Sequence, residues 1–180
     1  MISRALIICG LPGTGKTTLG SELGRHFACA HVEVSRFVRE SHAESGTSEP
    51  VALYVDRILG NPATRTLFVR ALCSQYSADT TSLLIISGPR TIDEVHYLKT
   101  QVGASMLVYL TCPAEVRRER KAGPDPTTGL GLLEREALEA KWDVSVVREH
   151  AQLILDTTLE LDLCRDILVR LAMVLGDRQP

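Results

Sequence analysis

Aromatic side chains make up only 4% of this 180-residue chain. Few rings are therefore available to stack on unpaired bases, which argues against sequence-independent binding of single-stranded nucleic acid. An excess of positive charge is also missing, because the formal net charge is -2 at pH 7. The chain has no overall field that attracts a nucleic-acid backbone, so an anion that binds here must meet a local cluster of cations.

Long apolar runs and closely spaced cysteines are absent as well. No stretch approaches the roughly 20 apolar residues that span a bilayer, and the amino terminus does not read as a cleavable signal. The 5 cysteines are odd in number, and no Cys-x-x-Cys pair suggests a zinc or redox centre. We therefore expect a cytoplasmic protein with reduced thiols and no contact with membranes.

What the chain does have is enough apolar material for one packed core. Hydrophobic residues make up 44% of the sequence, and 180 residues are too few for two domains of ordinary size. We expect residues 1–180 to form a single domain. Strand-length apolar runs alternate with longer helical patterns, which predicts an α/β fold with a parallel sheet. The predicted strands are residues 5–9, 31–34, 82–86, 106–110 and 153–155.

Three residue pairs have the pattern of a helix start. A side-chain acceptor stands first in each pair, followed by a proline or by a glutamate three residues later. The pairs are Asn61 with Pro62, Thr91 with Glu94, and Thr157 with Glu160. They predict helices that begin at these positions, the first running to about residue 77 and the last ending at Gly176.

The glycine-rich sequence G-L-P-G-T-G-K-T at residues 10–17 matches the phosphate-binding Walker A pattern. It follows a predicted strand and precedes a predicted helix, which is the context that the pattern requires. Glycines allow backbone N–H groups to turn inward around an anion. The residues expected to hold the nucleotide are Gly10, Leu11, Pro12, Gly13, Thr14, Gly15, Lys16, Thr17 and Thr18.

Two side chains of this loop have distinct expected roles. Lys16 is the catalytic cation that reaches the β- and γ-phosphates, and Thr17 ligates magnesium. The first turn of the following helix adds a positive dipole end beneath the phosphates. No N-K-x-D-type motif that reads guanine is apparent, so we expect ATP with Mg²⁺ as the donor.

Together with three further segments, this loop resembles the P-loop nucleoside monophosphate kinase group, which includes adenylate kinase and the dephospho-coenzyme A kinase-like proteins. The segments are S-R-F-V-R at residues 35–39, S-G-P-R-T at 87–91 and C-P-A-E-V-R-R-E-R at 112–120. The resemblance implies a P-loop NTPase three-layer sandwich, with a five-stranded parallel sheet in the order 2-3-1-4-5 and helices on both faces. It also implies that residues 35–80 are an inserted acceptor-binding region.

The resemblance assigns a role to arginines outside the loop. The arginines of the group that match Arg39 and Arg90 bind the acceptor's phosphate. We expect Arg36 and Glu33 to contact the substrate as well. The alternative for charged residues of the inserted region, Arg36 among them, is that they keep a helix face in solvent.

A second arginine set flanks residues 121–131, a segment rich in glycine and proline that looks like a lid. At about 100° per residue, Arg117 and Arg120 share one helix face, whereas Arg118 diverges. Arg135 resembles the second lid arginine of these kinases. We expect Arg117, Arg120 and Arg135 to be catalytic, because guanidinium groups can neutralise charge on the transferred phosphoryl group.

One position departs from the group's pattern. Its members commonly carry an acidic residue at the end of the third strand, where it helps to hold magnesium through water, but Ser87 stands here. A serine cannot neutralise charge, so either magnesium is held less firmly or another carboxylate assists, with Glu33 and Asp93 as the candidates. Glu33 is favoured because ligands of open α/β sheets gather beyond the carboxyl ends of the strands, although a purely structural role for it is the alternative.

These patterns predict an ATP-dependent phosphotransferase that moves the γ-phosphate to a nucleoside monophosphate or a similar phosphate-bearing metabolite. One alternative is a kinase that phosphorylates a hydroxyl, in the manner of dephospho-coenzyme A kinase, with Glu33 as the base. The other is a nucleotide-responsive ATPase or switch that acts on a macromolecular partner. We expect a small-molecule acceptor as the partner and no nucleic acid.

Overall fold

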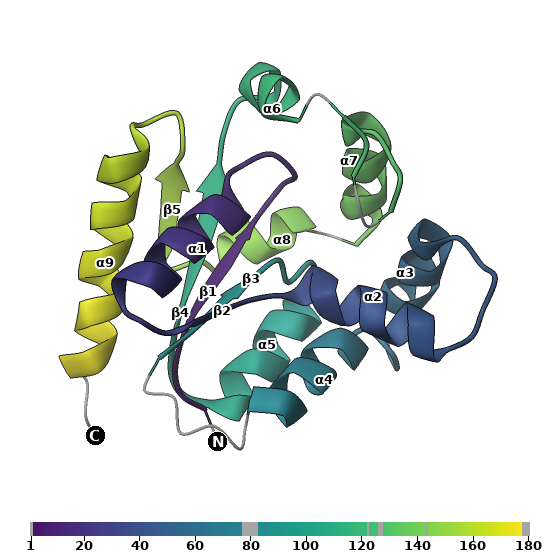
Figure 1. The fold of residues 1–180 in the computed structure, drawn as a ribbon, viewed down its shortest axis with the longest axis horizontal. Helices are drawn as coiled ribbons and strands as arrows, with labels where there is room; N and C mark the ends of the chain where they lie inside the picture. The colour runs from purple at the N-terminus through teal and green to yellow at the C-terminus, as the bar shows by residue number, and fades with distance from the viewer. Residues whose placement is uncertain (1, 77–82, 122, 126–127, 143, 178–180) are drawn as a thin grey trace.

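A five-stranded parallel sheet forms the centre of the computed structural model, which describes residues 2–76, 83–121, 123–125, 128–142 and 144–177 (Figure 1). The strand order is β2-β3-β1-β4-β5, and every strand pair is parallel. The expected topology is therefore confirmed. The strands are β1 Ile2–Gly10, β2 Ala30–Glu33, β3 Leu84–Ser87, β4 Val102–Thr111 and β5 Leu153–Asp156.

Helices cover both faces of this sheet. On one face α1 packs against α9, and on the other lie α4, α5 and α8 (Figure 1). Within the described residues the helices are α1 Lys16–His26, α2 Val34–Glu44, α3 Val51–Gly60, α4 Leu67–Tyr76, α5 Ile92–Gln101, α6 Ala114–Arg120, α7 Leu132–Lys141, α8 Val144–Glu149 and α9 Leu161–Asp177. The three layers of the expected sandwich are present.

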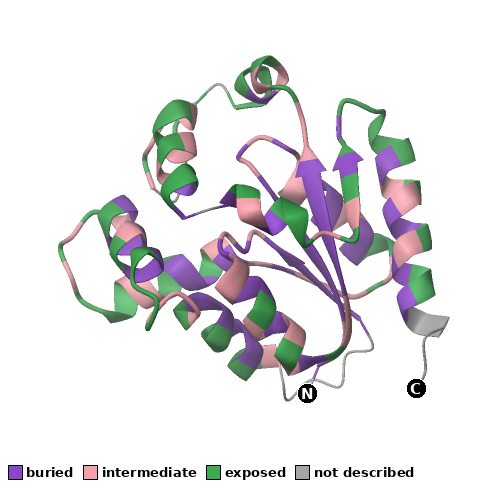
Figure 2. Cartoon of the chain, turned by 180° about the vertical axis from the view of Figure 1, so that it is seen from behind, coloured by how far each residue is buried: buried purple, intermediate pink, exposed green. Residues whose placement is uncertain are grey.

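Alternation along β1 shows how the sheet divides the apolar interior. Leu6 and Ile8 face the cluster that includes α1 and α9, whereas Ala5 and Ile7 face the larger cluster that includes α5 and α8. Because both faces of a parallel sheet are covered, the strand is a continuous apolar run rather than an alternating one. The buried strands lie between helices whose outer surfaces are exposed (Figure 2).

The capping box predicted at Thr91 is confirmed. The Thr91 hydroxyl accepts a hydrogen bond from the backbone N of Glu94 at 3.1 Å, and the Glu94 carboxylate accepts one from the backbone N of Thr91 at 3.1 Å. The same carboxylate accepts a second bond from the backbone N of Arg90 at 2.6 Å. The backbone that leads from β3 into α5 is therefore fixed at Arg90.

The helix start predicted at Asn61 is wrong. Helix α3 continues to Gly60, residues 61–66 form turns, and α4 begins only at Leu67. The Asn61 side chain does act as a cap, but of a turn, because its Oδ1 accepts a hydrogen bond from the backbone N of Ala63 at 3.0 Å. Asparagine supports both arrangements, and tertiary packing selected the turn. Residue 77, the predicted end, lies outside the described residues.

The helix start predicted at Thr157 is also wrong, since α9 begins at Leu161. Thr157 is buried directly after β5, and its hydroxyl donates to the backbone O of Thr111 at 3.2 Å. Its side chain therefore connects two strand ends. The strand predicted at residues 31–34 is also shifted by one residue, because Val34 already belongs to α2.

Among the described residues, no helix has the length and apolar character that crossing a membrane requires.

Candidate nucleotide and acceptor site

The loop between β1 and α1 has the backbone conformation that an anion cradle requires. Gly13 and Gly15 adopt φ angles of 83° and 86°, in the left-handed region that favours glycine. The Cβ of any other residue at position 13 would lie 3.0 Å from the Cβ of Arg117. At Gly15 an added Cβ would meet no atom within 4 Å, so the glycine is needed there for its backbone angles.

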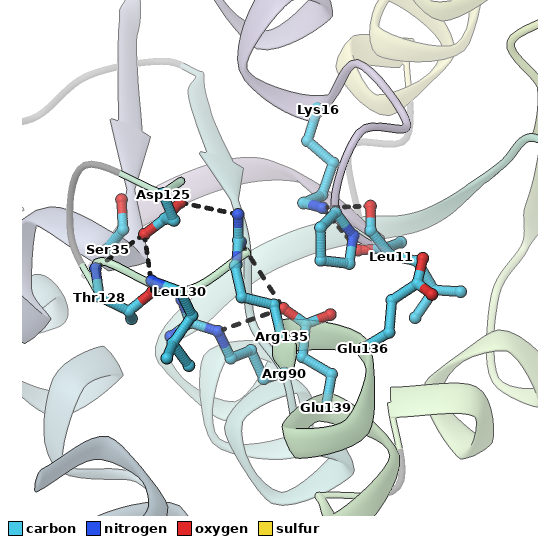
Figure 3. Close-up of polar contacts among 12 residues, drawn as sticks. Leu11, Lys16, Ser35, Arg90, Asp125, Thr128, Leu130, Arg135, Glu136 and Glu139 are labelled. Atoms are coloured by element: carbon cyan, nitrogen blue, oxygen red, sulfur yellow. Dashed lines mark hydrogen bonds and ion pairs between the residues drawn. The ribbon is translucent and has the colours of Figure 1, made fainter. Parts of the chain in front are cut away.

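Lys16 is the first residue of α1 and folds back along this loop. Its ammonium donates to the backbone O of Gly10 at 2.6 Å and of Leu11 at 2.8 Å (Figure 3). Burial lowers the pKa of Lys16 to about 8, and the nearby Glu139 carboxylate partly opposes that shift. The lysine is held by neutral carbonyl groups, which a phosphate could displace.

A polar cavity of about 700 Å³ opens beside the loop at the carboxyl ends of the strands. Most of the residues proposed from the sequence line it together: Gly10, Pro12, Gly13, Gly15, Lys16, Thr17, Thr18, Glu33, Arg39, Arg90, Arg120 and Arg135. Four predicted residues do not line it, namely Leu11, Thr14, Arg36 and Arg117. Thr14 is instead buried, and its hydroxyl donates to the backbone O of Leu11 at 2.8 Å.

Glu33 lies beside the predicted magnesium ligand. The Thr17 hydroxyl donates to the Glu33 carboxylate at 3.1 Å, whereas the other candidate carboxylate, Asp93, forms an ion pair with Arg65 at 3.2 Å. A hydroxyl and a carboxylate oxygen are ligand types that Mg²⁺ accepts, so these residues fit a magnesium nucleotide. The geometry favours Glu33 over Asp93 as the acidic neighbour of such an ion.

Ser87, which stands where an acid is common, has a histidine partner. Its buried hydroxyl lies 2.8 Å from Nε2 of His31, and the other ring nitrogen of His31 lies 3.2 Å from the Ser21 hydroxyl. Burial lowers the pKa of His31. Gly20 of α1 makes room for this ring, because a Cβ there would lie 2.3 Å from Nε2.

Another part of the cavity wall carries arginines that form ion pairs with carboxylates. Arg135 pairs with Asp125 at 2.7 Å and lies 3.8 Å from the buried carboxylate of Glu139, which is also 3.9 Å from Arg90 (Figure 3). Sequence reasoning missed Glu139 and Asp125. A signal for Glu139 existed, because it stands four residues after Arg135 on one helix face.

Arg117 lies behind the glycine loop rather than in the cavity. It is buried and pairs with Glu136, and its guanidinium also donates to the backbone O of Cys112 at 3.2 Å and of Pro12 at 3.4 Å. Arg117 was expected to be catalytic, but it is not among the residues that line the cavity. The spacing of residues along one helix could not predict the burial of Arg117, because the groups that cover it come from the glycine loop and from α7.

Arg120 and Arg36 also differ in their surroundings. Arg120 lines the cavity, and its guanidinium donates to the backbone O of Thr157 at 2.6 Å. Arg36 forms an exposed ion pair with Glu40 at 2.7 Å, so the solvated alternative describes its position in this structure. Arg39 lines the cavity from the same helix, α2.

A family model described as an AAA domain matches residues 6–137, more than half of the chain. The chain belongs to this family. Two curated proteins are similar to this AAA-domain chain. A UPF0200 protein of Hyperthermus butylicus is 26% identical over 87% of both chains, and an adenylate kinase of Streptococcus sanguinis is 31% identical over 52% of this chain and 45% of its own length.

Solved structures of kinases share the fold of this AAA-domain chain. A shikimate kinase from Acinetobacter baumannii has a TM-score of 0.61 at 20% identity, covering 100% of this chain and 97% of its own. A sugar kinase from a Janibacter species has a TM-score of 0.62 at 16% identity, covering 99% and 96%. The family match and these relatives confirm the predicted P-loop nucleoside monophosphate kinase-like group, and the solved structures share its fold.

Proposed function

We propose that this chain transfers the γ-phosphate of ATP to a small acceptor that carries an anionic group, such as a nucleoside monophosphate. The observation that carries the proposal is one cavity lined by the glycine loop, by Arg39 and Arg90, and by Arg120 and Arg135. Phosphoryl transfer needs little covalent help from a protein, so it depends on holding two anions together and neutralising their charge. A cavity with cations on two sides has the residues for that task.

The donor side would consist of the glycine loop and the start of α1. Its backbone N–H groups and the helix dipole would hold the phosphates of ATP, and Lys16 would exchange its carbonyl partners for phosphate oxygens. Thr17 would ligate Mg²⁺, with Glu33 beside it. The magnesium nucleotide supplies the phosphoryl group and part of the charge compensation.

The acceptor side would consist of helices α2, α3 and α4, which are inserted between β2 and β3. We propose Arg39 of α2 and Arg90, which follows β3, as the groups that bind the acceptor's anion. Planar guanidinium groups can each form two parallel hydrogen bonds with a phosphate or carboxylate. We do not include Arg36 among these groups, because its guanidinium forms an exposed ion pair with Glu40.

Residues 121–131, of which 122, 126 and 127 lie outside the described residues, would exclude water once both substrates are bound. Exclusion matters because water competes with the acceptor for the γ-phosphate. Gly129 has a φ of 72°, and Asp125 ties the segment to Arg135 on α7. Substrate phosphates would compete with Asp125 and Glu139 for Arg135, and so would release Asp125 from the ion pair that holds it to α7.

A panel of acceptors tests the proposal. Nucleoside monophosphates, phosphorylated metabolites and small hydroxy acids would be incubated with magnesium ATP, and phosphorylated product would be measured directly. One small acceptor that raises ATP turnover at least about 100-fold over hydrolysis supports a kinase. Stimulation by a macromolecule alone would instead indicate the nucleotide-responsive switch.

A hydroxyl-bearing acceptor without a nucleobase is the second candidate. The described cavity-lining residues include no aromatic ring, and their apolar side chains are Pro12, Pro89 and Val144. Nucleobases bind best against apolar or aromatic surfaces, so this lining favours a small polar acceptor. Glu33 would then be available to accept the hydroxyl proton. Phosphorylation of a hydroxy acid in the same panel, without phosphorylation of any nucleotide, would select this candidate.

A further inference from the structure

The buried Trp142 connects the proposed acceptor arginine Arg90 to the inserted helix α3. The guanidinium carbon of Arg90 lies 5.8 Å from the centroid of the indole ring, within the range of a cation–π contact. The indole Nε1 donates a hydrogen bond to Asp56 of α3 at 3.0 Å. Three segments that are far apart in the sequence therefore meet through one side chain.

The other contacts of Arg90 are a hydrogen bond to its backbone and a longer ion pair with its guanidinium. The Glu94 carboxylate accepts a hydrogen bond from the backbone N of Arg90. The guanidinium lies 3.9 Å from Glu139, which is too long for a hydrogen bond, and its buried Nη1 has no hydrogen-bond partner among the described residues. The indole face, together with the charge of the buried Glu139 carboxylate, therefore limits where this guanidinium can move.

Asp56 in turn fixes the orientation of the indole. A buried tryptophan requires a partner for its N–H, and the Asp56 carboxylate supplies one. Lys141 also approaches Asp56 at 3.5 Å, but its side chain is 62% exposed, so this ion pair is screened by solvent. The hydrogen bond from the indole, rather than the ion pair with Lys141, is therefore the contact of Asp56 that fixes the orientation of the ring.

We propose that Trp142 and Asp56 are positioning residues that orient Arg90 toward an oxyanion of the acceptor, a phosphate or a carboxylate. The inference rests on the proposed function, which gives Arg90 that anion. Neither Trp142 nor Asp56 contacts the acceptor. They act through Arg90, and they make its orientation depend on the position of α3 in the inserted region.

Two substitutions of Asp56 separate the hydrogen bond from the charge. Asp56→Asn and Asp56→Leu both remove the charge and the ion pair with Lys141, but only asparagine keeps an oxygen that accepts from the indole. The full chain would first be saturated with magnesium and a non-hydrolysable ATP analogue, so that inorganic phosphate does not bind to the glycine loop. Phosphate would then be titrated by calorimetry. Fluorescence would give a local signal, because the chain has 1 tryptophan.

The expected result is a difference between the two Asp56 variants that is confined to the phosphate site. Asp56→Asn should bind phosphate within about 2-fold of the wild type, whereas Asp56→Leu should bind about 5- to 10-fold more weakly, in keeping with the loss of one hydrogen bond. Both variants should bind the ATP analogue with the wild-type affinity. If Asp56→Leu does not fold, Trp142→Phe serves instead, because it keeps a ring but loses the N–H, and it should weaken phosphate binding by a similar factor.

Two outcomes would overturn the inference. Wild-type phosphate affinity in the folded Asp56→Leu and Trp142→Phe proteins would show that the indole does not position Arg90. Equal losses for phosphate and for the ATP analogue would show a merely structural role. Arg90→Ala distinguishes a failure of the proposed function, because unchanged phosphate binding in that variant would remove Arg90 from the acceptor site altogether.

Discussion

The two sides of the cavity are built differently. The donor side comes from consecutive residues, and its lysine is held by backbone carbonyl groups of the same loop. The acceptor side and the adjoining helix α7 take their cations from separate segments. The guanidinium groups of Arg90 and Arg135 face the carboxylates of Glu139 and Asp125. The donor side is therefore fixed by local backbone geometry, whereas the acceptor side depends on ion pairs between distant elements, which a substrate anion can replace.

The largest effect is expected from the donor side. Lys16→Ala should lower turnover by about 10²- to 10³-fold, because the charge that compensates the transferred phosphoryl group is lost while the glycine loop remains. Turnover with saturating ATP would be measured together with the thermal unfolding midpoint, which should change little. Arg170→Ala on the exposed side of α9 is the matched control. Full turnover in Lys16→Ala would contradict the site.

Substitution of Arg117 tests whether this buried arginine stabilises the fold around the glycine loop or takes part in phosphoryl transfer. Arg117→Met should lower the free energy of unfolding by about 2–3 kcal/mol, because Glu136 loses its partner and two backbone carbonyls lose a donor. The measurement is denaturant unfolding, with the exposed Arg118→Ala as control. An Arg117→Met protein of wild-type stability that had lost turnover would return Arg117 to the catalytic role expected from the sequence.

The acceptor side should respond in binding rather than in folding. Arg90→Ala should raise the KM of the acceptor by about 10- to 100-fold and change the KM of ATP by less than about 3-fold, because a charge-assisted hydrogen bond to the acceptor is lost. Steady-state kinetics with the acceptor found in the panel would separate the two constants. An effect on ATP alone would assign Arg90 to the donor side, and the contrast between the two sides would fail.

A further effect concerns the pH dependence of the free energy of unfolding, through Glu94, whose carboxyl group accepts a hydrogen bond from the backbone N of Arg90. Burial raises the pKa of Glu94 from its ordinary 4.5 to about 7. The folded protein keeps this proton up to about pH 7, whereas the unfolded chain loses it near pH 4.5, so the contribution of Glu94 to the free energy of unfolding falls as the pH rises between these values.

One pKa unit corresponds to about 1.4 kcal/mol, so the full difference is about 3 kcal/mol, and about 2–3 kcal/mol of it falls between pH 5 and pH 8. Glu94→Gln keeps a side-chain oxygen for the capping box but cannot ionise, so it should make stability less dependent on pH in this interval. Denaturant unfolding of both proteins at pH 5 and pH 8 measures the difference. Parallel pH profiles would show that Glu94 ionises normally in the folded state.

The sequence by itself determined the features that depend on residues close together in the chain. The apolar runs gave the parallel strands, the Walker A spacing gave the loop at residues 10–17, and the Thr91–Glu94 pair gave a capping box, because each is a local backbone pattern. The strand order came from resemblance to a known group and was confirmed in the structure.

Tertiary structure decided what depends on partners from distant segments. Arg117 and Arg120 share a helix, yet one is buried against Glu136 and the other extends to Thr157, because different elements pack beside them. Helix α4 begins at Leu67 instead of Asn61 for a related reason, since a side-chain acceptor can cap either a turn or a helix. Periodicity tells which way a residue points from its own helix, but only packing supplies the group that it meets there.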